Sequence, residues 1–434
     1  MSGPCFAGIR RGWRYNRITG LSERSSNHML SRIKYFVVSA SACLTILLVA
    51  GSVASRGADQ SETLKHIGVF SDVVAHIKSE YVEEPDMKSV TLGALNGLLE
   101  AIDPFASYLN ADQYQDYLKN KDAKRADVGL VLSKRPGLIG VVGTWPGSPA
   151  ANAGLSTHDM IESIKGISTR DMPLAYANLL LEGANGTTVQ LSVVRARHPE
   201  PQTITLTRVN LAVPAVETKM LPGGVGYLQI GALTSDEVKQ TADDIRQLQR
   251  DGAQKLVLDL RYCAVGTPED GIALANLFLS SGRITYLKGQ KVPERDFDAD
   301  PAKAVTNLPL AVLVNHGTAD GAEITAAALG GNKRAQLLGE PTYGDAAMRR
   351  ALTMDDGSAI ILSVAKYYSP DGKAIQDARV VPGTLVAGAE PQIEYDDNGE
   401  PIAEPEPQQP QSKKTEDDPV VKKALEALGA VAKA

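Results

Sequence analysis

Apolar residues near the start of the chain follow the period of an amphipathic helix. They recur at spacings of three and four at Leu64, Ile67, Phe70, Val74, Ile77 and Tyr81. A second stripe consists of Leu92, Leu95, Leu98, Leu99 and Ile102. Asp103-Pro104 ends this stripe, because a proline disfavours helix in the residue before it. The pattern predicts a helical hairpin within residues 55–125, with one buried face on each helix.

The middle of the chain changes to short apolar runs separated by glycine and proline. Within residues 126–208 the runs 129–132, 138–142 and 188–194 are typical of β-strands. Three later runs, KLVLDL, LPLAVLVN and AIILSVAKYY, are continuous rather than alternating. Continuous runs suit strands that are covered on both faces, and helical patterns separate the first two. We expect a β-rich domain and then a layered α/β domain over residues 209–388.

The end of the chain is predicted to be a linker followed by a helix. Residues 389–418 are acidic and rich in proline, so they cannot bury enough apolar surface to offset their chain entropy. Residues 419–434 form the helix, with Asp418 as N-cap and Pro419 as its first residue. One side of this helix carries Val421, Ala424, Leu425, Leu428 and Val431. We expect it to dock on its own chain or on a second copy in preference to a separate partner.

The beginning of the chain has the pattern of an export signal. Residues 1–35 carry seven basic residues against one acidic residue, and the uncharged apolar segment 36–54 follows. A 19-residue helix is about 28 Å long, close to the thickness of a bilayer core. Two interpretations stay open, a retained anchor and a signal peptide cleaved after Ala54, and the true start is Met1 or Met29. Both predict export, with the membrane contacted only through this segment.

Composition excludes several classes of protein. Apolar residues make up 43% and charged residues 22%, which is ordinary for a globular protein, and three cysteines cannot form a disulfide framework. The formal charge is −6 and no basic stripe is present, so we expect no nucleic-acid partner. The six histidines are scattered and no phosphate-binding glycine loop occurs, so we expect no metal and no cofactor.

Four long blocks resemble one family of proteins. They are GSPAANAGLSTHDMIESIKGIS, KLVLDLR, AVLVNHGTADGAEITAAALGGNKRAQLLGEPTYG and DGSAIILSVAKYYSPDGKAIQ, and the earlier IDPFASYL fits as well. In this order they are similar to the carboxyl-terminal processing, or tail-specific, serine peptidases. The resemblance implies an α/β multidomain fold: a helical N-terminal region, a PDZ-like β-rich domain and a layered α/β peptidase-like domain. It also implies a bacterial periplasmic or envelope protein whose PDZ domain captures the C-terminal tails of polypeptides.

The three catalytic positions of that family differ here. In the family pattern the nucleophile lies in G-[ST]-A-S-A-S-E, and the segment Gly317–Glu323 has Asp320 at the place of the serine. Asp345 stands where the family has its lysine, and Arg349 stands where it has a glutamine. A serine nucleophile needs a neutral amine to accept its proton, which a carboxylate cannot replace. The resemblance therefore implies a peptidase scaffold without the expected catalytic residues.

The replacements suggest a specific local structure. Two carboxylates in one pocket repel each other, whereas a nearby guanidinium favours both in the ionised form. Arg349 follows Asp345 by four residues, so it would be the counter-ion if that segment were helical. We therefore predict a salt-bridged plug formed by Asp320, Asp345 and Arg349. The alternative for these two aspartates is a pair that shares one proton, as in aspartic peptidases.

Other residues could supply catalysis in place of the missing serine. Cys263 and His316 each follow an apolar strand, so with Asp320 they could form a Cys-His-Asp constellation, and Thr318 is a second candidate nucleophile. The family loop after L-D-L-R is N-N-P-G-G, whereas residues 262–266 read YCAVG, which leaves the oxyanion-binding amides in doubt.

The PDZ-like region keeps more of its expected machinery. The resemblance places Val128, Gly129, Leu130 and Val131 in the carboxylate-binding loop, and Leu174 and Asn178 on the helix that lines the side-chain pocket. Two functions follow as hypotheses. The first is a non-catalytic binder of C-terminal tails that regulates an active peptidase or assembles with itself. The second is an active peptidase that uses the non-standard groups named above.

Overall fold

The computed structural model describes residues 64–120, 125–387 and 415–430, except residues 136, 158, 171, 196 and 197. The chain divides into two units, Met1–Met87 and Lys88–Ala434. The basic lead, segment 36–54 and most of the predicted linker lie outside the described residues. No helix among the residues that are described is both long and apolar enough to cross a bilayer.

Two predicted helices are present, but their apolar faces are not buried as predicted. The first helix covers residues 64–80, and Leu64, Ile67 and Phe70 keep 63%, 57% and 51% of their surface exposed. The second is α2, Met87–Glu100, in which Leu99 is buried while Leu98 is 61% exposed. The prediction of a buried face is therefore wrong for the first helix and holds for one residue of α2. The spacing of apolar residues specified a helix, but it did not specify a surface on which the helix packs.

The next part of the chain, residues 130–207, forms an antiparallel sheet. Its strand order is β2-β3-β4-β6-β7, with β5 paired to β4. The strands and associated helices are β2 Leu130–Arg135, β3 Leu138–Thr144, α4 Pro149–Asn152, β4 Met160–Ile164, β5 Ile167–Ser168, α5 Leu174–Leu181, β6 Thr188–Arg195 and β7 His198–Thr207. The predicted β-rich runs correspond to β2, β3 and β6. Their inward side chains, such as Ile139, Ile161 and Leu191, pack with α5 in one apolar core.

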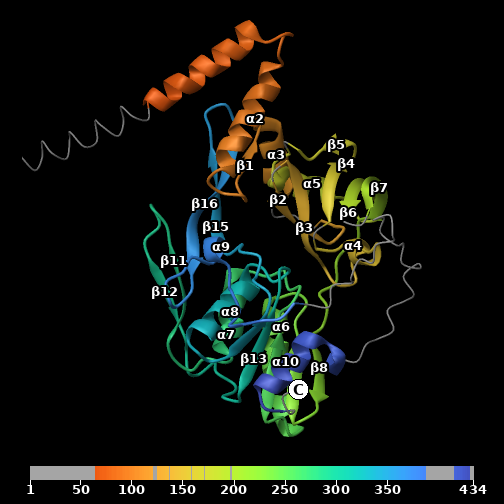
Figure 1. The fold of residues 1–434 in the computed structure, drawn as a ribbon, viewed down its shortest axis with the longest axis vertical. Helices are drawn as coiled ribbons and strands as arrows, with labels where there is room; N and C mark the ends of the chain where they lie inside the picture. The colour runs from red at the N-terminus through yellow and green to blue at the C-terminus, as the bar shows by residue number, and fades with distance from the viewer. Residues whose placement is uncertain are drawn as a thin grey trace, which may run out of the picture. The chain divides into compact units, whose positions relative to one another are not determined.

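The central sheet has helices on both faces (Figure 1). Its order is β17-β14-β13-β10-β9-β8, and β9, β10, β13, β14 and β17 run parallel. The strands are β8 Glu217–Leu221, β9 Val225–Gln229, β10 Lys255–Asp259, β13 Leu310–Val314, β14 Gln336–Gly339 and β17 Thr384–Leu385. One face of the sheet packs against three helices, which are α6 Ser235–Arg250, α7 Pro268–Asn276 and α8 Gly321–Gly331.

The continuous apolar runs are explained by this layering. In β10, Leu256 and Leu258 pack in the core beneath α6, α7 and α8, whereas Val257 faces the opposite core. In β13, Val312 and Leu313 divide in the same way. Successive side chains of a strand point to opposite faces, so a strand covered on both sides is apolar throughout. The prediction for KLVLDL and LPLAVLVN is confirmed.

The third continuous run belongs to a different sheet, so the prediction made for it is wrong. AIILSVAKYY forms the whole of β16, which is antiparallel to β1, β11 and β15. Burial alternates along part of this strand, so it is not covered on both faces. The sheet has the order β1-β16-β11-β12, with β15 off this path. The remaining bounds are β1 Ser107–Leu109, α3 Ala111–Asn120, β11 Arg283–Lys288, β12 Arg295–Asp298, β15 Ala347–Thr353, β16 Ala359–Tyr368 and α9 Ile375–Ala378.

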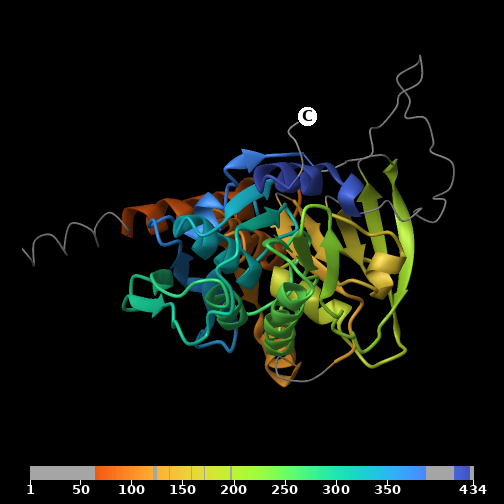
Figure 2. The ribbon, with the colours of Figure 1, turned by 90° about the horizontal axis from the view of Figure 1, so that it is seen from below.

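The predicted C-terminal helix docks on its own chain. After the short turn η1, Thr415–Asp417, α10 covers Pro419–Ala427 and begins at the N-cap Asp418, as predicted. Its residues Val421 and Leu425 are buried against Tyr227 and Leu313 of the central sheet. Figure 2 shows α10 lying along this sheet. Intramolecular docking is therefore observed.

Candidate functional site

The turn between β13 and α8 holds Asp320 in a strained backbone conformation. Asp320 immediately precedes α8 and has φ 48° and ψ −117°. Residues with a Cβ atom rarely adopt a positive φ, and such strain persists only where the surrounding structure imposes it. Here α8 packs very closely on α7, because a Cβ on Gly271 would lie 2.0 Å from the carbonyl oxygen of Gly321. This packing fixes where the helix starts and so where Asp320 lies.

A buried carboxylate links this turn to the segment that carries Asp345. Glu323, in the first turn of α8, is completely buried, and its Oε2 accepts from the amides of Asp320 (3.1 Å) and Asp345 (2.7 Å). Its Oε1 accepts from the amide of Gly344 (2.6 Å) and from the hydroxyl of Thr342. Burial raises the pKa of Glu323 to about 7, although these donors favour the ionised form. Glu323 is therefore the residue that brings the two candidate aspartates together.

The predicted ion pair between Asp345 and Arg349 is present, but a strand forms it. Arg349 Nη2 donates to Asp345 Oδ1. Arg349 lies in β15, whose register against β16 shifts between Met348 and Arg349. Such an irregularity bends a strand and redirects its side chains. The contact is confirmed, whereas the helical segment that was expected to create it is wrong.

Burial shifts the pKa of both aspartates in the same direction. Burial, followed by the neighbouring Asp345, raises the pKa of Asp320 well above its usual range, and Arg349 opposes this only in part. Burial also raises the pKa of Asp345, and contact with Arg349 lowers it. Asp320 Oδ1 is buried and has no hydrogen-bond partner among the described residues. The site favours a protonated Asp320 beside an ion-paired Asp345, and not two ionised aspartates as the sequence suggested.

An aromatic pair packs against the guanidinium of this ion pair. The Arg349 guanidinium lies 4.4 Å from the centre of the Phe105 ring, and Phe105 meets Tyr343 edge to face at 5.7 Å. Both rings also pack on the core of the antiparallel sheet. Arg349 is therefore held by the Asp345 carboxylate and by the face of the Phe105 ring. These contacts connect the site to the antiparallel sheet that begins with β2.

Three amides of the loop after β10 are bonded within the protein. Tyr262 has φ 60°, and its amide donates to Asn315 Oδ1 at 2.9 Å. The amide of Cys263 donates to the Leu260 carbonyl at 3.2 Å, and that of Ala264 to the Tyr262 carbonyl at 3.0 Å. An oxyanion hole needs amides that point at the reacting atom. These three amides point elsewhere.

The alternative nucleophiles are buried and already bonded. Cys263 is completely buried, and burial raises the pKa of its thiol to about 12. His316 Nε2 lies 3.5 Å from Glu340 Oε2, so this imidazole faces a different carboxylate from the one proposed for a triad. The hydroxyl of the buried Thr318 donates to the Leu260 carbonyl at 2.8 Å. The thiol and this hydroxyl stabilise the fold in this structure.

The predicted peptide-binding residues lie along one edge of the antiparallel sheet. Among the described strands β2 pairs with β3 alone, and α5 packs beside it. Gly129 has φ 80°, and a Cβ there would lie 2.2 Å from Ser148 Cβ, so glycine is required. The candidate side chains differ in exposure: Val128, Leu130 and Leu174 are buried, Val131 is half-buried and Asn178 is exposed.

Two charged residues missed by the sequence analysis shape this edge. Asp127 Oδ1 accepts from the Gly129 amide at 2.5 Å, so a carboxylate of the chain already uses one loop amide. The buried Arg208 donates to the carbonyls of Leu180 (2.8 Å) and Leu181 (2.7 Å), which holds the end of α5. The sequence around Asp127 and Arg208 contains no motif that would mark them, because the groups they contact come close only in the folded chain.

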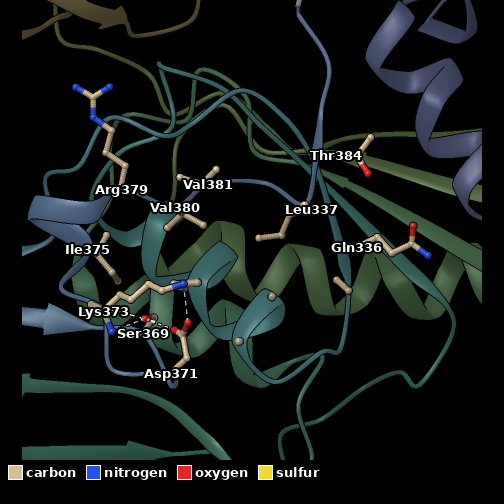
Figure 3. A pocket seen from close by; sticks show the side chains of 15 residues that line it. Gln336, Leu337, Ser369, Asp371, Lys373, Ile375, Arg379, Val380, Val381 and Thr384 are labelled. Atoms are coloured by element: carbon tan, nitrogen blue, oxygen red, sulfur yellow. Dashed lines mark hydrogen bonds and ion pairs between the residues drawn. The ribbon is translucent and has the colours of Figure 1, made fainter.

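A cavity of about 430 Å³ lies elsewhere, beside the C-terminal half of α8 (Figure 3). Two of its charged groups pair with each other: Lys373 Nζ lies 3.0 Å from Asp371 Oδ2, which belongs to the carboxylate whose Oδ1 accepts from the Ser369 hydroxyl at 2.5 Å. Asp320, Asp345 and Arg349 do not line it. Within the described ranges no three histidine, cysteine or carboxylate side chains are placed to hold a metal ion.

Comparison with known proteins places this architecture in one family. The model of peptidase family S41 matches residues 224–386. A carboxyl-terminal-processing protease of Synechocystis sp. is 32% identical over 318 residues, which are 71% of this chain and 74% of that protein. The chain belongs to the carboxyl-terminal-processing peptidase family. The family resemblance seen in the sequence is thus confirmed.

Further relatives extend the match over most of this family member. A carboxy-terminal-processing protease of Bartonella bacilliformis is 28% identical over 363 residues, 82% of this chain and 83% of that protein. The solved photosystem II D1 C-terminal processing protease has a similar mixed α/β fold, with a TM-score of 0.60 and 23% identity over 73% of this chain and 92% of that one. The family segment 224–386 contains Asp320, Asp345 and Arg349.

Proposed function

We propose that this family member binds the C-terminal tails of polypeptides and does not cleave them. The observation that carries the proposal is the state of the positions that the family resemblance assigns to catalysis. The strained turn presents Asp320, and the residue at the lysine position, Asp345, is ion-paired to Arg349. Peptide hydrolysis by a serine-lysine pair requires a nucleophile and a neutral amine. Neither group is present at these positions.

The surrounding structure supports the loss of catalysis. The loop amides at Tyr262, Cys263 and Ala264 are bonded within the protein, and the thiol of Cys263 is buried, which raises its pKa and disfavours the thiolate. A peptidase that lacks its reacting residues accelerates hydrolysis only about 10³- to 10⁴-fold over the uncatalysed reaction in water. Even this residual acceleration requires an intact oxyanion hole. The non-standard peptidase is therefore the disfavoured alternative.

The tail-binding part of the proposal places a PDZ-like domain at residues 126–208. An extended peptide would add to the unpaired edge of β2, and its carboxylate would meet the Gly129 loop. Leu174 on α5 would contact its last apolar side chain. We further propose the peptidase-like domain at residues 209–388, an envelope location with segment 36–54 as anchor or signal, and an active peptidase or a second copy as partner.

The lack of cleavage is tested with an unfolded reporter protein that ends in an apolar tail. The unmodified chain is expected to leave the reporter intact over hours. The Asp320→Ala variant is the matched control, because it removes the residue at the nucleophile position. Reporter cleavage by the unmodified chain that Asp320→Ala abolishes would overturn the proposal.

Tail binding is tested with a fluorescent peptide that ends in two alanines. We expect anisotropy to report binding of the free acid and about ten-fold weaker binding of the C-terminal amide, which corresponds to about 1.4 kcal/mol. Leu174→Ala should weaken binding, whereas Val213→Ala, at a residue 41% exposed and outside the proposed groove, should not. Equal affinity for acid and amide would reject recognition of a terminal carboxylate.

A further inference from the structure

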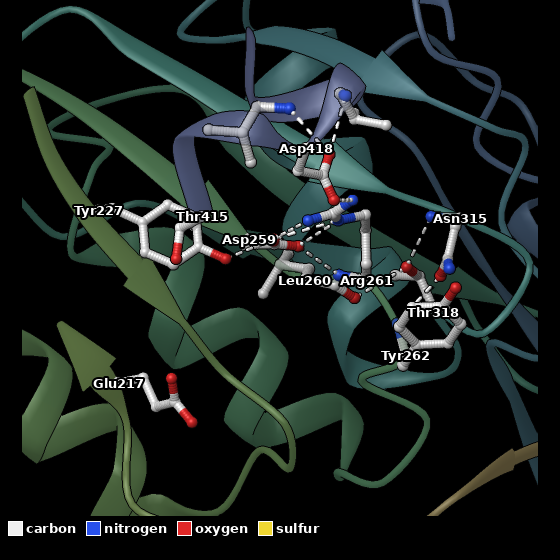
Figure 4. Close-up of polar contacts among 12 residues, drawn as sticks. Glu217, Tyr227, Asp259, Leu260, Arg261, Tyr262, Asn315, Thr318, Thr415 and Asp418 are labelled. Atoms are coloured by element: carbon white, nitrogen blue, oxygen red, sulfur yellow. Dashed lines mark hydrogen bonds and ion pairs between the residues drawn. The ribbon is translucent and has the colours of Figure 1, made fainter. Parts of the chain in front are cut away.

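Helix α10 is joined to the central sheet by a charged contact as well as by apolar packing (Figure 4). Asp418 Oδ1 caps the helix by accepting from the amides of Val420 (2.8 Å) and Val421 (3.1 Å). Its other oxygen, Oδ2, accepts from Arg261 Nη1 at 2.9 Å. One carboxylate therefore starts the helix and also binds it to the end of β10.

Arg261 is held from its other side by a buried carboxylate. Its Nε and Nη2 donate to Asp259 at 3.0 Å and 2.7 Å, and the Tyr227 hydroxyl donates to the same carboxylate at 2.7 Å. Asp259 is completely buried and the Arg261 side chain is 13% exposed. Charge-assisted contacts in such a setting are strong and geometrically specific. The position of Arg261 thus depends on Asp259 in the sheet and on Asp418 in α10.

The residue after Arg261 begins the loop of the candidate site. The Tyr262 amide donates to Asn315 Oδ1, which also accepts from the Gly317 amide at 3.1 Å. The amide of Ala319, next to Asp320, donates to the Cys263 carbonyl at 3.0 Å. A continuous series of bonds therefore leads from α10 through Arg261 to the strained turn.

We propose that α10 is a C-terminal latch that positions the two loops of the candidate site, 262–266 and 315–320, with Asp418 as the positioning residue. When α10 is docked, Asp418 completes the binding of the Arg261 guanidinium and so restrains Tyr262. When the contact between Asp418 and Arg261 is lost, Arg261 is bound by Asp259 only. The hydrogen bonds of the two loops then break more often. The latch is a property of the fold, and it does not depend on whether the site cleaves peptides.

The test is amide hydrogen exchange of the full-length chain. Asp418→Asn keeps a side-chain oxygen for the helix cap but removes the charged bond to Arg261. We expect exchange in segments 262–266 and 315–320 to become about ten-fold faster, while the interior of β13 is unchanged and reports an intact fold. Leu425→Ala weakens α10 docking without touching Asp418 and should accelerate the same two segments. Lys423→Gln removes an ion pair with Glu426 on α10 and is the control expected to change neither.

Two results would overturn the latch. Faster exchange in α10 alone after Asp418→Asn would mean that Asp418 acts only as a helix cap. Unchanged exchange of both loops in Leu425→Ala would mean that α10 docking does not position them, and this variant decides the question if Asp418→Asn does not fold.

Discussion

Replacing Arg349 by methionine tests the account of the carboxylate cluster most directly. The guanidinium donates to Asp345 and stacks on Phe105, with 27% and 20% of the Arg349 and Asp345 side chains exposed. Hydrogen bonds to charged groups contribute about 1.5–3 kcal/mol, and a partly exposed cation–π contact adds about 0.5–1 kcal/mol. Partial exposure weakens both through solvent screening. We expect Arg349→Met to lower the free energy of unfolding by about 2 kcal/mol at pH 8.

The size of this loss should depend on pH. Without Arg349, burial raises the pKa of Asp345 in the folded protein above its value in the unfolded chain, and the nearby Asp103 raises it further. A raised carboxyl pKa destabilises the folded state as pH rises from the unfolded pKa through the folded pKa, by about 1.4 kcal/mol for each pH unit that separates the two values. Near pH 4 much of this penalty is absent, so mainly the loss of the ring contact should remain.

Urea unfolding of the full-length protein at pH 4 and pH 8 measures this difference. Arg350→Met is the matched control, because Arg350 is exposed on the same strand and should change stability little. Adding Asp345→Asn to Arg349→Met should recover stability at pH 8, because it removes the unpaired charge. An equal loss at both pH values, without recovery in the double variant, would refute the role given to Asp345.

Three further outcomes follow from the geometry. Glu323→Gln places an amide group against four donors and should lower the free energy of unfolding by about 2–3 kcal/mol in urea titrations. Gly271→Ala forces a Cβ to 2.0 Å from a carbonyl oxygen and should lower the thermal midpoint by several degrees, whereas Gly93→Ala in α2 meets no atom within 4 Å and should not lower it. Asp127→Asn removes a charge that repels an incoming carboxylate; anisotropy should show affinity for a free-acid tail rising about three-fold with no change for the amide, a difference of about 0.7 kcal/mol.

The sequence predicted elements best where one physical requirement dominated. KLVLDL and LPLAVLVN were recognised as β10 and β13 because strands covered on both faces must be apolar at every position. Helix α10 was predicted to its first residue because an N-cap aspartate and a proline at the next position satisfy the free amides of a helix start.

Prediction was weaker where the partner of an element mattered. AIILSVAKYY has the same apolar run, yet β16 joins an antiparallel sheet, because a run of apolar residues does not specify which neighbours pair with it. The stripe at residues 64–81 specified a helix, but Leu64, Ile67 and Phe70 are exposed among the described residues, because the spacing of apolar residues does not specify the surface that would cover them.

By itself the sequence determined the family and which residues stand at positions 320, 345 and 349, since these depend on residue identity and order. Only the tertiary structure decided how these residues are arranged. It placed Glu323 where it accepts from the amides of both aspartates, brought Arg349 of β15 to Asp345, and joined Asp418 to Arg261 across 157 residues of chain. The physical reason is that burial and charge pairing depend on distance in space, which separation along the chain does not fix.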